Sequence, residues 1–595
     1  MQSLLISVTT GRRVQPDPLS ELTERVVEHL ERIYPDEDTH ALAKRFVSAM
    51  DYGGKIHSAP THTNLWTERD AVVICYGNSC TAPNEAPLAT LARVLHERTE
   101  GLFSMVHLLP FFPYSSDDGF SVINYRQVNE SLGGWEDITR FSKQYRLMGD
   151  LVMNHCSARS QWFLQYADNQ PPGAGYFIEM DDTMDVSQVV RPRSSPLAKP
   201  VRTPAGEKFV WCTFSHDQVD LNYANPETLL EMVGIIAFYL DQGISIFRLD
   251  AVAYIWKVIG TSCVNLPETH EIIRLLRTLV ARRAPEAILI TETNLPNREN
   301  LSYFGNANEA HWIYNFTLPP LVLHALTFGR ATYLNQWMMS MPPAQDGTAY
   351  LNFVTSHDGI GLRPAEGILP EAELEALVTT MKTRGGLISS RELDGRLVPY
   401  ELNISLYSAC ADESGCRSLQ RKKFLLAHAI MFGLEGVPAV YFPSLFSTEN
   451  ATHRVEATAH NRAINRPAWT EEGVNAHLEA ESEAAQFLDD LKSLMAMRRR
   501  QPAFHPNATQ FTLHLGDPVF AFWRQSRNRE QSIFCLHNLS GSPIDVPQNS
   551  LNLIDGERWI DLLSGESIDG YSKSLVLDPY QSCWITNWNS HAEQT

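Results

Sequence analysis

The sequence of 595 residues lacks long apolar runs, because no stretch approaches the roughly 18 consecutive apolar residues that a membrane-spanning helix needs. A short apolar run near the N-terminus has no basic segment before it, which argues against a secretory signal peptide. These two absences predict a protein that remains in the cytoplasm and has no membrane partner.

Basic residues are few relative to acidic ones: 49 Lys and Arg stand against 69 Asp and Glu, which gives a net charge of −20. A nucleic-acid-binding surface needs a basic stripe that neutralises phosphates, so this balance predicts no nucleic-acid partner. An acidic surface of this kind favours solubility.

The nine cysteines do not form a pattern typical of a metal site or a disulfide framework. The closest pairs are Cys75 with Cys80 and Cys410 with Cys416, and neither is a C-x-x-C. The odd number and scattered spacing predict reduced, mostly buried thiols and no metal site.

What the sequence does contain is a long alternation of strand-like and helix-like segments, from about residue 66 to about residue 505. Each strand-like run is apolar, and helical stretches separate the runs. The eight runs are 71–77, 105–111, 147–155, 244–252, 287–294, 309–316, 350–358 and 437–442. This alternation predicts an α/β fold whose parallel strands close into a (β/α)₈ TIM barrel, the catalytic domain.

Other regions depart from this rhythm. Residues 1–65 are predicted to form an N-terminal helical extension, because apolar residues recur at helical spacing from Leu19 to Ile33. Insertions at about 156–225 and 359–405 follow predicted strands, so we expect them over the C-terminal mouth of the barrel, where active sites form. Residues 506–595 contain short alternating strands and predict a C-terminal antiparallel β domain.

Polar residues gather where the predicted strands end. Arg248 and Asp250 lie two positions apart and therefore face the same side of one strand, and Glu292 ends the next strand. The other polar residues at strand ends are Asp150, Asn154, His155, His357 and Asp358. Because a barrel brings the ends of parallel strands to one mouth, we expect these side chains to lie close together.

Two of these acidic residues suit the cleavage of a glycosidic bond with retention, which needs carboxyl groups roughly 5–5.5 Å apart. Neighbouring strands lie about 4.7–4.9 Å apart, so their ends can span that distance. Arg248 is expected to lower the pKa of Asp250, which suits a nucleophile, and burial to raise the pKa of Glu292, which suits a proton donor. Asp358 can stabilise positive charge on the sugar. A lone buried aspartate is more often structural, and it is the group of acids at strand ends that favours catalysis.

The motifs DLVMNH, FRLDA, TET and SHDG occur in this order and resemble the conserved regions of the α-amylase family, glycoside hydrolase family 13. Further stretches are similar to its sucrose-phosphorylase subgroup: SSDDGFSVINY, RPR at 191–193, KVIGTSC, PYELN at 399–403 and HNRAINR at 460–466. LWTERDAVVICYG, SHDGIGL and PETH look like the branch of that subgroup whose aglycone is glycerate.

The resemblance implies a retaining disaccharide phosphorylase that needs no metal or organic cofactor. This glycosyltransferase would convert an α-glucoside and inorganic phosphate into α-D-glucose 1-phosphate and a free aglycone. Asp250 would form a β-glucosyl ester, Glu292 would act as general acid and base, and Asp358 would stabilise the transition state. The residues implied to hold the glucosyl ring are Asp117, Phe120, His155, Arg248, His357 and Arg462. Those implied to bind phosphate or the acceptor are Arg193, Tyr400 and Glu401.

The chain departs from this pattern near the acceptor side. Relatives of this type usually read K-E-x-G-T-S-C, whereas Val258 follows Lys257 here, and the loop 362–370 also differs. The aglycone therefore stays open among glycerate, glycerol, fructose and a phosphorylated sugar, and the sequence does not indicate the oligomeric state. Rival activities are a sucrose or glucosylglycerol phosphorylase and an α-glucosidase or transglucosylase. A non-catalytic sugar-binding protein is disfavoured, because the nucleophile and the acid are both present.

Overall fold

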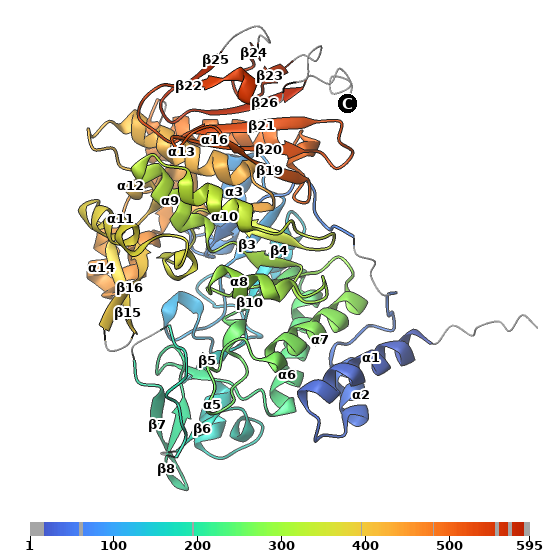
Figure 1. The fold of residues 1–595 in the computed structure, drawn as a ribbon. Helices are drawn as coiled ribbons and strands as arrows, with labels where there is room; N and C mark the ends of the chain where they lie inside the picture. Colours follow the sequence, from blue (N-terminus) through green and yellow to red (C-terminus); the bar gives the residue numbers. More distant parts are fainter. Residues whose placement is uncertain are drawn as a thin grey trace, which may run out of the picture.

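The computed structural model describes residues 17–58, 63–181, 183–192, 195–393, 396–479, 481–551, 553, 559–568 and 574–587. At its centre eight parallel strands form a closed barrel and follow one another around it in chain order (Figure 1). The strands are β1 (Val72–Cys75), β3 (Met105–Leu108), β4 (Arg146–Val152), β10 (Ile244–Asp250), β11 (Ile288–Thr291), β12 (Trp312–Tyr314), β13 (Ala349–Asn352) and β17 (Val437–Tyr441). Each predicted apolar run supplies one of them, so the prediction of a TIM barrel is confirmed.

The barrel strands are buried on both faces, which explains why they read as continuous apolar runs. The main helices around them are α3 (Pro87–Thr99), α4 (Trp135–Ser142), α6 (Pro226–Asp241), α7 (Pro267–Arg283), α9 (Leu318–Phe328) and α13 (Arg417–Gly433). Side chains fill the interior of such a barrel, so the strand ends and the loops are left to form a site.

Local sequence signals set the boundaries of α6, the helix that leads into β10. The side chain of Asn225 accepts a hydrogen bond from the Glu227 N–H at the start of the helix. After its end the chain passes through Gly243 at φ +90°, where a Cβ atom would lie only 2.3 Å from Ser142 Oγ. Only glycine fits this turn, which directs the chain into the strand that ends at Asp250.

Both insertions follow barrel strands, and both contain small antiparallel sheets that their weak periodicity did not predict. The first contains the pair β5 (His155–Ser157) and β9 (Gln218–Asp220), and a sheet of β6 (Glu179–Met180), β8 (Gly206–Trp211) and β7 (Ala198–Thr203). The second contains β14 (Ile360–Gly361), β16 (Arg396–Asn403) and β15 (Leu387–Leu393), together with the helix α11 (Glu371–Thr383). In Figure 1 both lie on the left, away from the C-terminal sheet at the top.

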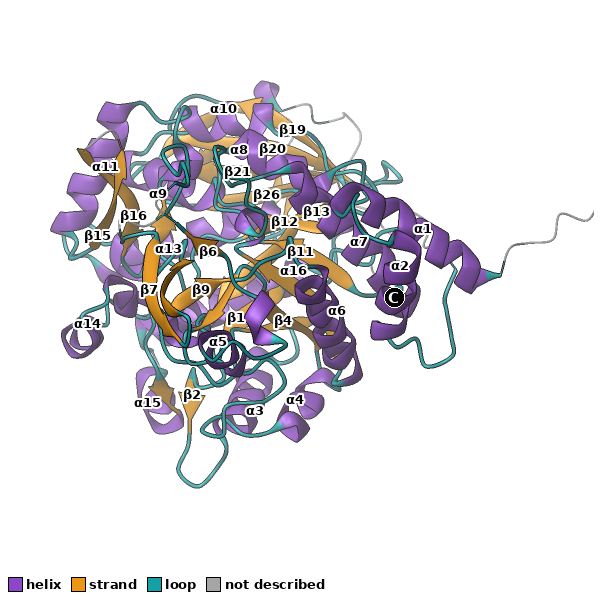
Figure 2. Ribbon diagram, turned by 90° about the horizontal axis from the view of Figure 1, so that it is seen from below, coloured by secondary structure: helices purple, strands orange, loops and turns teal. Residues whose placement is uncertain are grey.

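Two N-terminal helices, α1 (Pro18–Ile33) and α2 (Thr39–Ala49), pack beside α7 and α6 respectively (Figure 2). The buried apolar positions of α1 include Leu22, Val26, Leu30 and Ile33. Leu19, which belongs to the same predicted stripe, lies in the first turn and is 46% exposed. The described residues between α2 and β1 are not helical, so helix ends well before residue 65. Residues 1–16 of the predicted extension lie outside the described part of the chain.

The C-terminal part forms the predicted antiparallel sheet, which has a small hydrophobic core of its own. Its strands, in sheet order, are β19 (Thr509–His514), β20 (Val519–Gln525), β21 (Ser532–Asn538), β26 (Ser582–Asn587), β23 (Trp559–Asp561) and β24 (Ser567–Ile568). The buried guanidinium of Arg524 joins this sheet to the barrel domain by donating a hydrogen bond of 2.7 Å to the Gly433 carbonyl.

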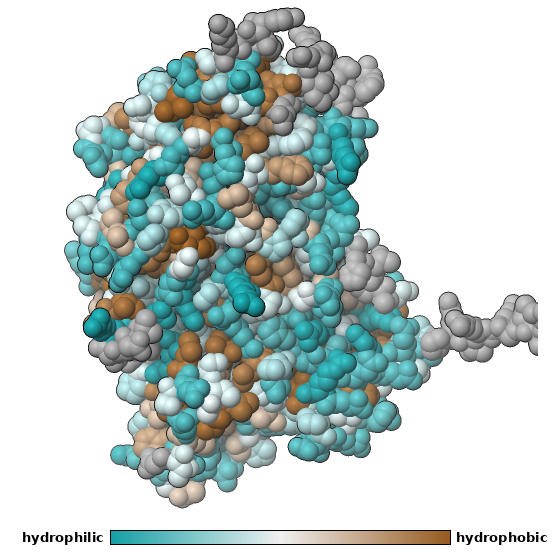
Figure 3. All heavy atoms as spheres, viewed as in Figure 1, coloured by the Kyte–Doolittle hydropathy of each residue, from teal (hydrophilic) through white to brown (hydrophobic). Residues whose placement is uncertain are grey.

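The surface in Figure 3 is mostly hydrophilic, with hydrophobic residues in scattered patches. Within the described ranges, no helix combines the length and apolar character that crossing a membrane requires. All nine cysteines are described; none forms a disulfide, and eight are buried, as predicted. The described residues include no group of three or more His, Cys, Asp or Glu side chains that could hold a metal ion.

Arg498, at the end of the helix α16 (Glu483–Arg498), is 1% exposed and donates to backbone carbonyls of several segments at the base of the barrel. Its acceptors include Phe432 at 2.9 Å and Phe504 at 3.3 Å. Because Arg498→Met would leave these buried carbonyls unpaired, we expect it to lower the free energy of unfolding by about 3 kcal/mol. The matched control is Arg499→Met, which removes one hydrogen bond, to the Gly101 carbonyl. This variant should lower the free energy of unfolding by about 1 kcal/mol or less. Denaturant unfolding measures both, and equal losses would contradict the prediction.

Candidate functional site

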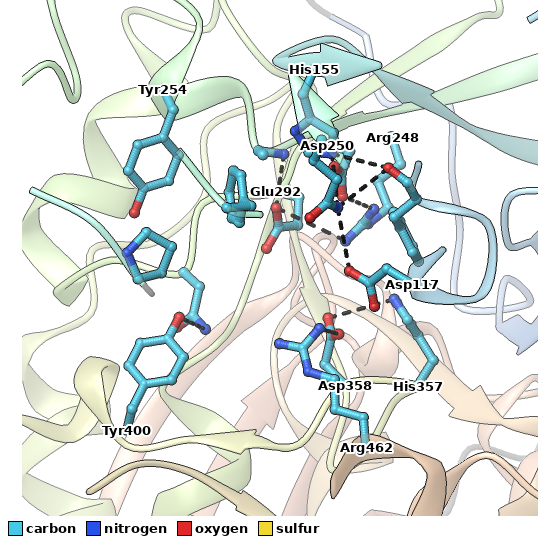
Figure 4. Close-up of a pocket in the computed structure, with 16 residues that line it drawn as sticks. Asp117, His155, Arg248, Asp250, Tyr254, Glu292, His357, Asp358, Tyr400 and Arg462 are labelled. Carbon is cyan, nitrogen blue, oxygen red and sulfur yellow. Dashed lines mark hydrogen bonds and ion pairs between the residues drawn. The ribbon is translucent and has the colours of Figure 1, made fainter. Parts of the chain in front are cut away.

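A cavity opens at the C-terminal ends of the barrel strands, and most of the predicted site residues line it (Figure 4). The predicted residues on its wall are Asp117, Phe120, His155, Arg248, Asp250, Glu292, His357, Asp358, Tyr400 and Arg462. Arg193 lies outside the described residues, although its neighbour Pro192 lines the cavity. Glu401 does not line the cavity.

Asp250 is held at the end of β10 by Arg248, whose Nη1 lies 2.6 Å from Asp250 Oδ1. Both side chains point into the barrel mouth, as the spacing of two residues in a strand predicts. The same Arg248 nitrogen donates to Asp150, its partner in the register between β4 and β10. Asp150 in turn lies 2.8 Å from His107 Nε2. This buried chain of polar contacts fixes the orientation of the Asp250 carboxylate.

Glu292 follows β11, the strand that pairs in parallel with β10. The backbone N–H of Ala251 donates to Glu292 Oε2 at 2.9 Å, which ties this carboxyl to the residue after Asp250. Arg248 Nη2 lies 4.0 Å from Glu292 Oε2, so one guanidinium faces both carboxyl groups. Two acids on neighbouring strands therefore converge on one cavity, as predicted.

Burial in the cavity raises the pKa of both Asp250 and Glu292, and Arg248 only partly offsets this effect. The prediction that the pKa of Asp250 lies below its usual value is wrong: Arg248 does lower it, but desolvation and the charge of Glu292 outweigh the guanidinium. The raised pKa of Glu292 agrees with the prediction. The two carboxyl groups therefore titrate as a coupled pair. When the pair holds one proton, the shorter contact of Arg248 with Asp250 than with Glu292 favours the anion on Asp250.

Asp358 is the third acid in the cavity, and cations surround it. Its Oδ1 lies 2.6 Å from Arg462 Nη1 and 3.6 Å from Arg466 Nη2. Burial opposes ionisation of Asp358, but Arg462, His357 and Arg466 together bring its pKa well below the usual value. Asp358 is therefore a carboxylate at neutral pH.

His357 and Phe120 form an aromatic part of the wall, with stacked rings whose centroids are 5.2 Å apart. Burial lowers the pKa of His357 to about 3, so the ring is neutral. Both ring nitrogens are buried and have no hydrogen-bond partner among the described residues; the nearest carboxylate oxygen, of Asp358, is 3.5 Å from Nε2. A neutral imidazole in this state can bond to a hydroxyl group of a ligand.

The second insertion contributes two adjacent residues of β16 that behave differently. Tyr400 lines the cavity, and its hydroxyl accepts a 3.5 Å hydrogen bond from the Asn294 side chain. Glu401 is 1% exposed and accepts two hydrogen bonds from Arg462, at 3.0 and 2.7 Å. Glu401 therefore lies behind the cavity wall, where it orients the guanidinium of Arg462, which pairs with Asp358.

Several lining residues were not predicted: Ala251, Tyr254, Asn294, Phe214 and Gln218. Ala251 ends the FRLDA motif, Tyr254 lies three residues after it, and Asn294 directly follows TET. Their closeness to the ends of β10 and β11 is the signal that could have found them. Phe214 and Gln218 belong to the first insertion, which has no periodicity that predicts contact with the mouth. Figure 4 shows Tyr254 and Tyr400 on one side of the two acids, with His357 and Arg462 on the other.

The altered segment near Val258 lies beside the cavity rather than in its wall. Val258 is 42% exposed and does not line the cavity. Its neighbour Lys257 is buried and lies 2.6 Å from Asp220 Oδ2 and 2.7 Å from Asn154 Oδ1. The Lys257 contacts join the end of β4 to the first insertion, and Asn154 thus has a structural role.

A closed barrel with paired acids after neighbouring strands is the architecture of an α-amylase-type enzyme, and the family "Alpha amylase, catalytic domain" matches residues 102–359. A glucosylglycerate phosphorylase of Spirochaeta thermophila is 43% identical over 526 residues, or 87% of this chain and 90% of the relative. A glucosylglycerate phosphorylase of Allomeiothermus silvanus is 40% identical over 570 residues, or 95% of this chain and 99% of the relative. The chain belongs to the α-amylase family, in the branch that contains these two relatives.

A solved structure supports the same fold. The sucrose 6F-phosphate phosphorylase from Thermoanaerobacter thermosaccharolyticum superposes with a TM-score of 0.70 and 24% identity, covering 86% of this chain and 97% of that one. The relatives of 43% and 40% identity confirm the resemblance that the sequence motifs indicated.

Proposed function

We propose that the chain is a retaining disaccharide phosphorylase, which converts 2-O-α-D-glucosyl-D-glycerate and phosphate into α-D-glucose 1-phosphate and D-glycerate. The observation that carries the reaction type is the pair of acids, Asp250 held by Arg248 and Glu292 held by the Ala251 N–H, which face one cavity. The glucosylglycerate phosphorylases among the relatives support the choice of aglycone.

In the first step the Asp250 carboxylate attacks C1 of the glucosyl unit, and the bond from C1 to the aglycone oxygen breaks. Glu292 gives its proton to that oxygen, so glycerate leaves with a neutral hydroxyl group. In the second step a phosphate oxygen attacks C1 and displaces Asp250, while Glu292 takes up the proton that a protonated phosphate oxygen releases. Two inversions at C1 give net retention.

The remaining wall residues supply binding and charge stabilisation. Asp358, kept ionised by Arg462, faces the positive charge that develops on the sugar ring. His357 offers ring nitrogens to sugar hydroxyl groups, and Phe120 offers a ring face. His155 lies on the same wall, where its Nε2 is 3.0 Å from the Phe120 carbonyl. Asp117 lies on the same wall and can accept hydrogen bonds from sugar hydroxyl groups. We assign these residues to the glucosyl subsite.

Phosphate and the acceptor carboxylate are anions, so their subsite needs cationic or neutral donors. Tyr400 and Asn294 offer such donors at the outer wall, and Arg193 is the next residue along the chain from Pro192, which lines the cavity. Glu401 acts on this side only through Arg462. We propose that Arg193 and Tyr400 contact phosphate or glycerate.

The test of the function is a donor screen with purified enzyme and phosphate. Glucosylglycerate should give glucose 1-phosphate, and sucrose and glucosylglycerol should react at least tenfold more slowly. If sucrose or glucosylglycerol is the best donor, the proposed aglycone is wrong, but the protein is still a disaccharide phosphorylase. Release of free glucose at a rate independent of phosphate would instead indicate an α-glucosidase or transglucosylase. Arg193→Ala should raise the KM for phosphate about tenfold or more under the proposed function, since a charge-assisted contact is lost.

A pH profile tests the coupling between the two acids. Because Glu292 raises the pKa of Asp250, Glu292→Gln should lower that pKa and move the acidic limb of kcat/KM to lower pH. Activity needs the Asp250 anion and rises as pH passes the pKa of this group, so the direction of the shift follows. The donor should be α-glucosyl fluoride, whose leaving group needs no proton. An acidic limb that stays in place would contradict the coupling.

A further inference from the structure

A second cavity, of about 380 Å³, lies at the opposite end of the barrel from the mouth. Its barrel-side lining includes Pro285, His311 and Gly347, which precede β11, β12 and β13 at the N-terminal ends of these strands. The helices α1 and α7, which lie side by side in Figure 2, supply most of the rest of its described wall, and loop residues Thr63, Leu65, Ala307 and Asn308 complete it. This volume is in the range of small-molecule sites.

Arg277 on α7 lines this cavity and has no carboxylate within ion-pair distance among the described residues. It donates to two backbone carbonyls, of Glu309 at 2.9 Å and of Ala307 at 3.3 Å, which use only part of its N–H groups. Burial lowers its pKa to about 10, and no acid counteracts this effect. The segment between residues 58 and 63 reads Ala-Pro-Thr-His and contains no acid.

The other two α7 arginines in the wall differ in this respect. Arg274 lies 2.8 Å from Glu271 and 2.5 Å from Glu309. Arg282 lies 2.6 Å from Glu21 of α1. A guanidinium partly withdrawn from water is normally paired with an anion, and the half-buried Arg277 lacks the carboxylate partner that its neighbours have.

His311 places a second hydrogen-bond donor in the same wall. The Leu289 N–H donates to His311 Nδ1 at 3.0 Å, so in the neutral ring the hydrogen is on Nε2. The ring is neutral because burial and the nearby Arg277 bring the pKa of His311 well below its usual value. His311 is 6% exposed. A neutral N–H donor beside an uncompensated guanidinium is an arrangement that favours an anion.

The opposite wall of this cavity is formed by α1 and carries carboxylates. Glu21, Glu24 and Glu28 line it, together with Arg25, which lies 2.5 Å from Glu28, and His29. They would repel a second negative charge but can accept hydrogen bonds from hydroxyl groups. The two walls together suit a molecule with one oxyanion and a hydroxyl-bearing remainder.

We infer that this cavity is a binding site for a small hydroxylated oxyanion, such as a sugar phosphate or a hydroxy acid, whose anionic group contacts Arg277 and His311. The bound molecule bridges α7 and α1 and so fastens the N-terminal helices to the barrel. Because the cavity lies at the end of the barrel remote from the catalytic acids, its occupant does not compete with the glucosyl donor. The inference is independent of the proposed reaction.

The first test is structural and uses the unmodified chain. Crystals grown without sulfate or phosphate are soaked in selenate, whose anomalous scattering locates it. We expect a peak within hydrogen-bond distance of the Arg277 guanidinium and His311 Nε2. A peak at the catalytic cavity alone would overturn the inference.

The second test follows the thermal unfolding midpoint against glucose 1-phosphate or D-glycerate in wild type, Arg277→Met and Arg283→Met. Arg283 is the matched control on the same helix; it pairs with Asp241 and does not line the cavity. Binding at the catalytic cavity is common to all three chains, so differences between the curves report the second cavity. Wild type and Arg283→Met should show a larger anion-dependent rise than Arg277→Met. If the rise differs between the variants only with glucose 1-phosphate, the ligand of this cavity is a phosphate ester. If it differs only with D-glycerate, the ligand is a hydroxy acid. If the three curves coincide with both anions, the inference is overturned.

Discussion

Asp250→Asn is expected to lose about five orders of magnitude or more in kcat for glucose 1-phosphate formation. The amide has nearly the same shape and still accepts a hydrogen bond from Arg248, so folding and sugar binding should persist. It cannot form the glucosyl ester, and no other acid is placed to substitute, because Glu292 is bound by the Ala251 N–H and Asp358 by Arg462. Initial rates with glucosylglycerate and phosphate measure the loss.

Two further measurements separate this effect from a general disturbance. A 5-fluoro-α-glucosyl fluoride should label wild-type enzyme on the peptide that contains Asp250 and leave the variant unlabelled. Asp241→Asn, which removes an exposed acid paired with Arg283, is the control for the change in charge and should retain full activity. A label on a different residue would contradict the assignment of the nucleophile.

Glu292→Ala is expected to lose about 10³–10⁴-fold in rate with glucosylglycerate, since the departing oxygen then leaves without a proton. With α-glucosyl fluoride the first step should be nearly unaffected, because fluoride leaves as an anion. Azide requires no general base, so adding it should speed release of the glucosyl unit from Asp250 and yield α-glucosyl azide. Product analysis and the ratio of rates for the two donors measure these effects.

The comparison with Asp358→Asn makes this test specific. In the proposed mechanism Asp358 stabilises charge and transfers no proton, so its loss should slow the reaction of both donors by a similar factor, and azide should not restore the rate. Equal losses for both donors in Glu292→Ala would refute its role as the acid.

The barrel and the central acids could be predicted because they depend on local patterns. Apolar runs at regular intervals specify the strands, and the position of Asp250 at the end of one run places it at the mouth. The neighbouring unit then places Glu292 beside it, since strands adjacent in the chain are adjacent in this barrel.

The features that sequence reasoning missed depend on contacts between distant segments. Arg248 next to Asp250 suggests a lowered pKa, but desolvation and the charge of Glu292 arise only when the barrel closes. Glu401 follows Tyr400 in a motif, yet its carboxylate is taken by Arg462, which is 61 residues away. Phe214 and Gln218 reach the cavity through the fold of an insertion whose composition gives no periodic signal.

The Arg466 contacts have a consequence for how the enzyme matures during synthesis. Its guanidinium lies 2.8 Å from Asp118, near the start of the barrel, and donates to the His357 carbonyl at the same distance. A truncated chain that ends before residue 462 would contain Asp250 and Glu292 but neither Arg466 nor Arg462, which pairs with Asp358. Such a truncated polypeptide is expected to have no catalytic activity. Activity is therefore expected to appear only after the segment that contains both arginines has been synthesised.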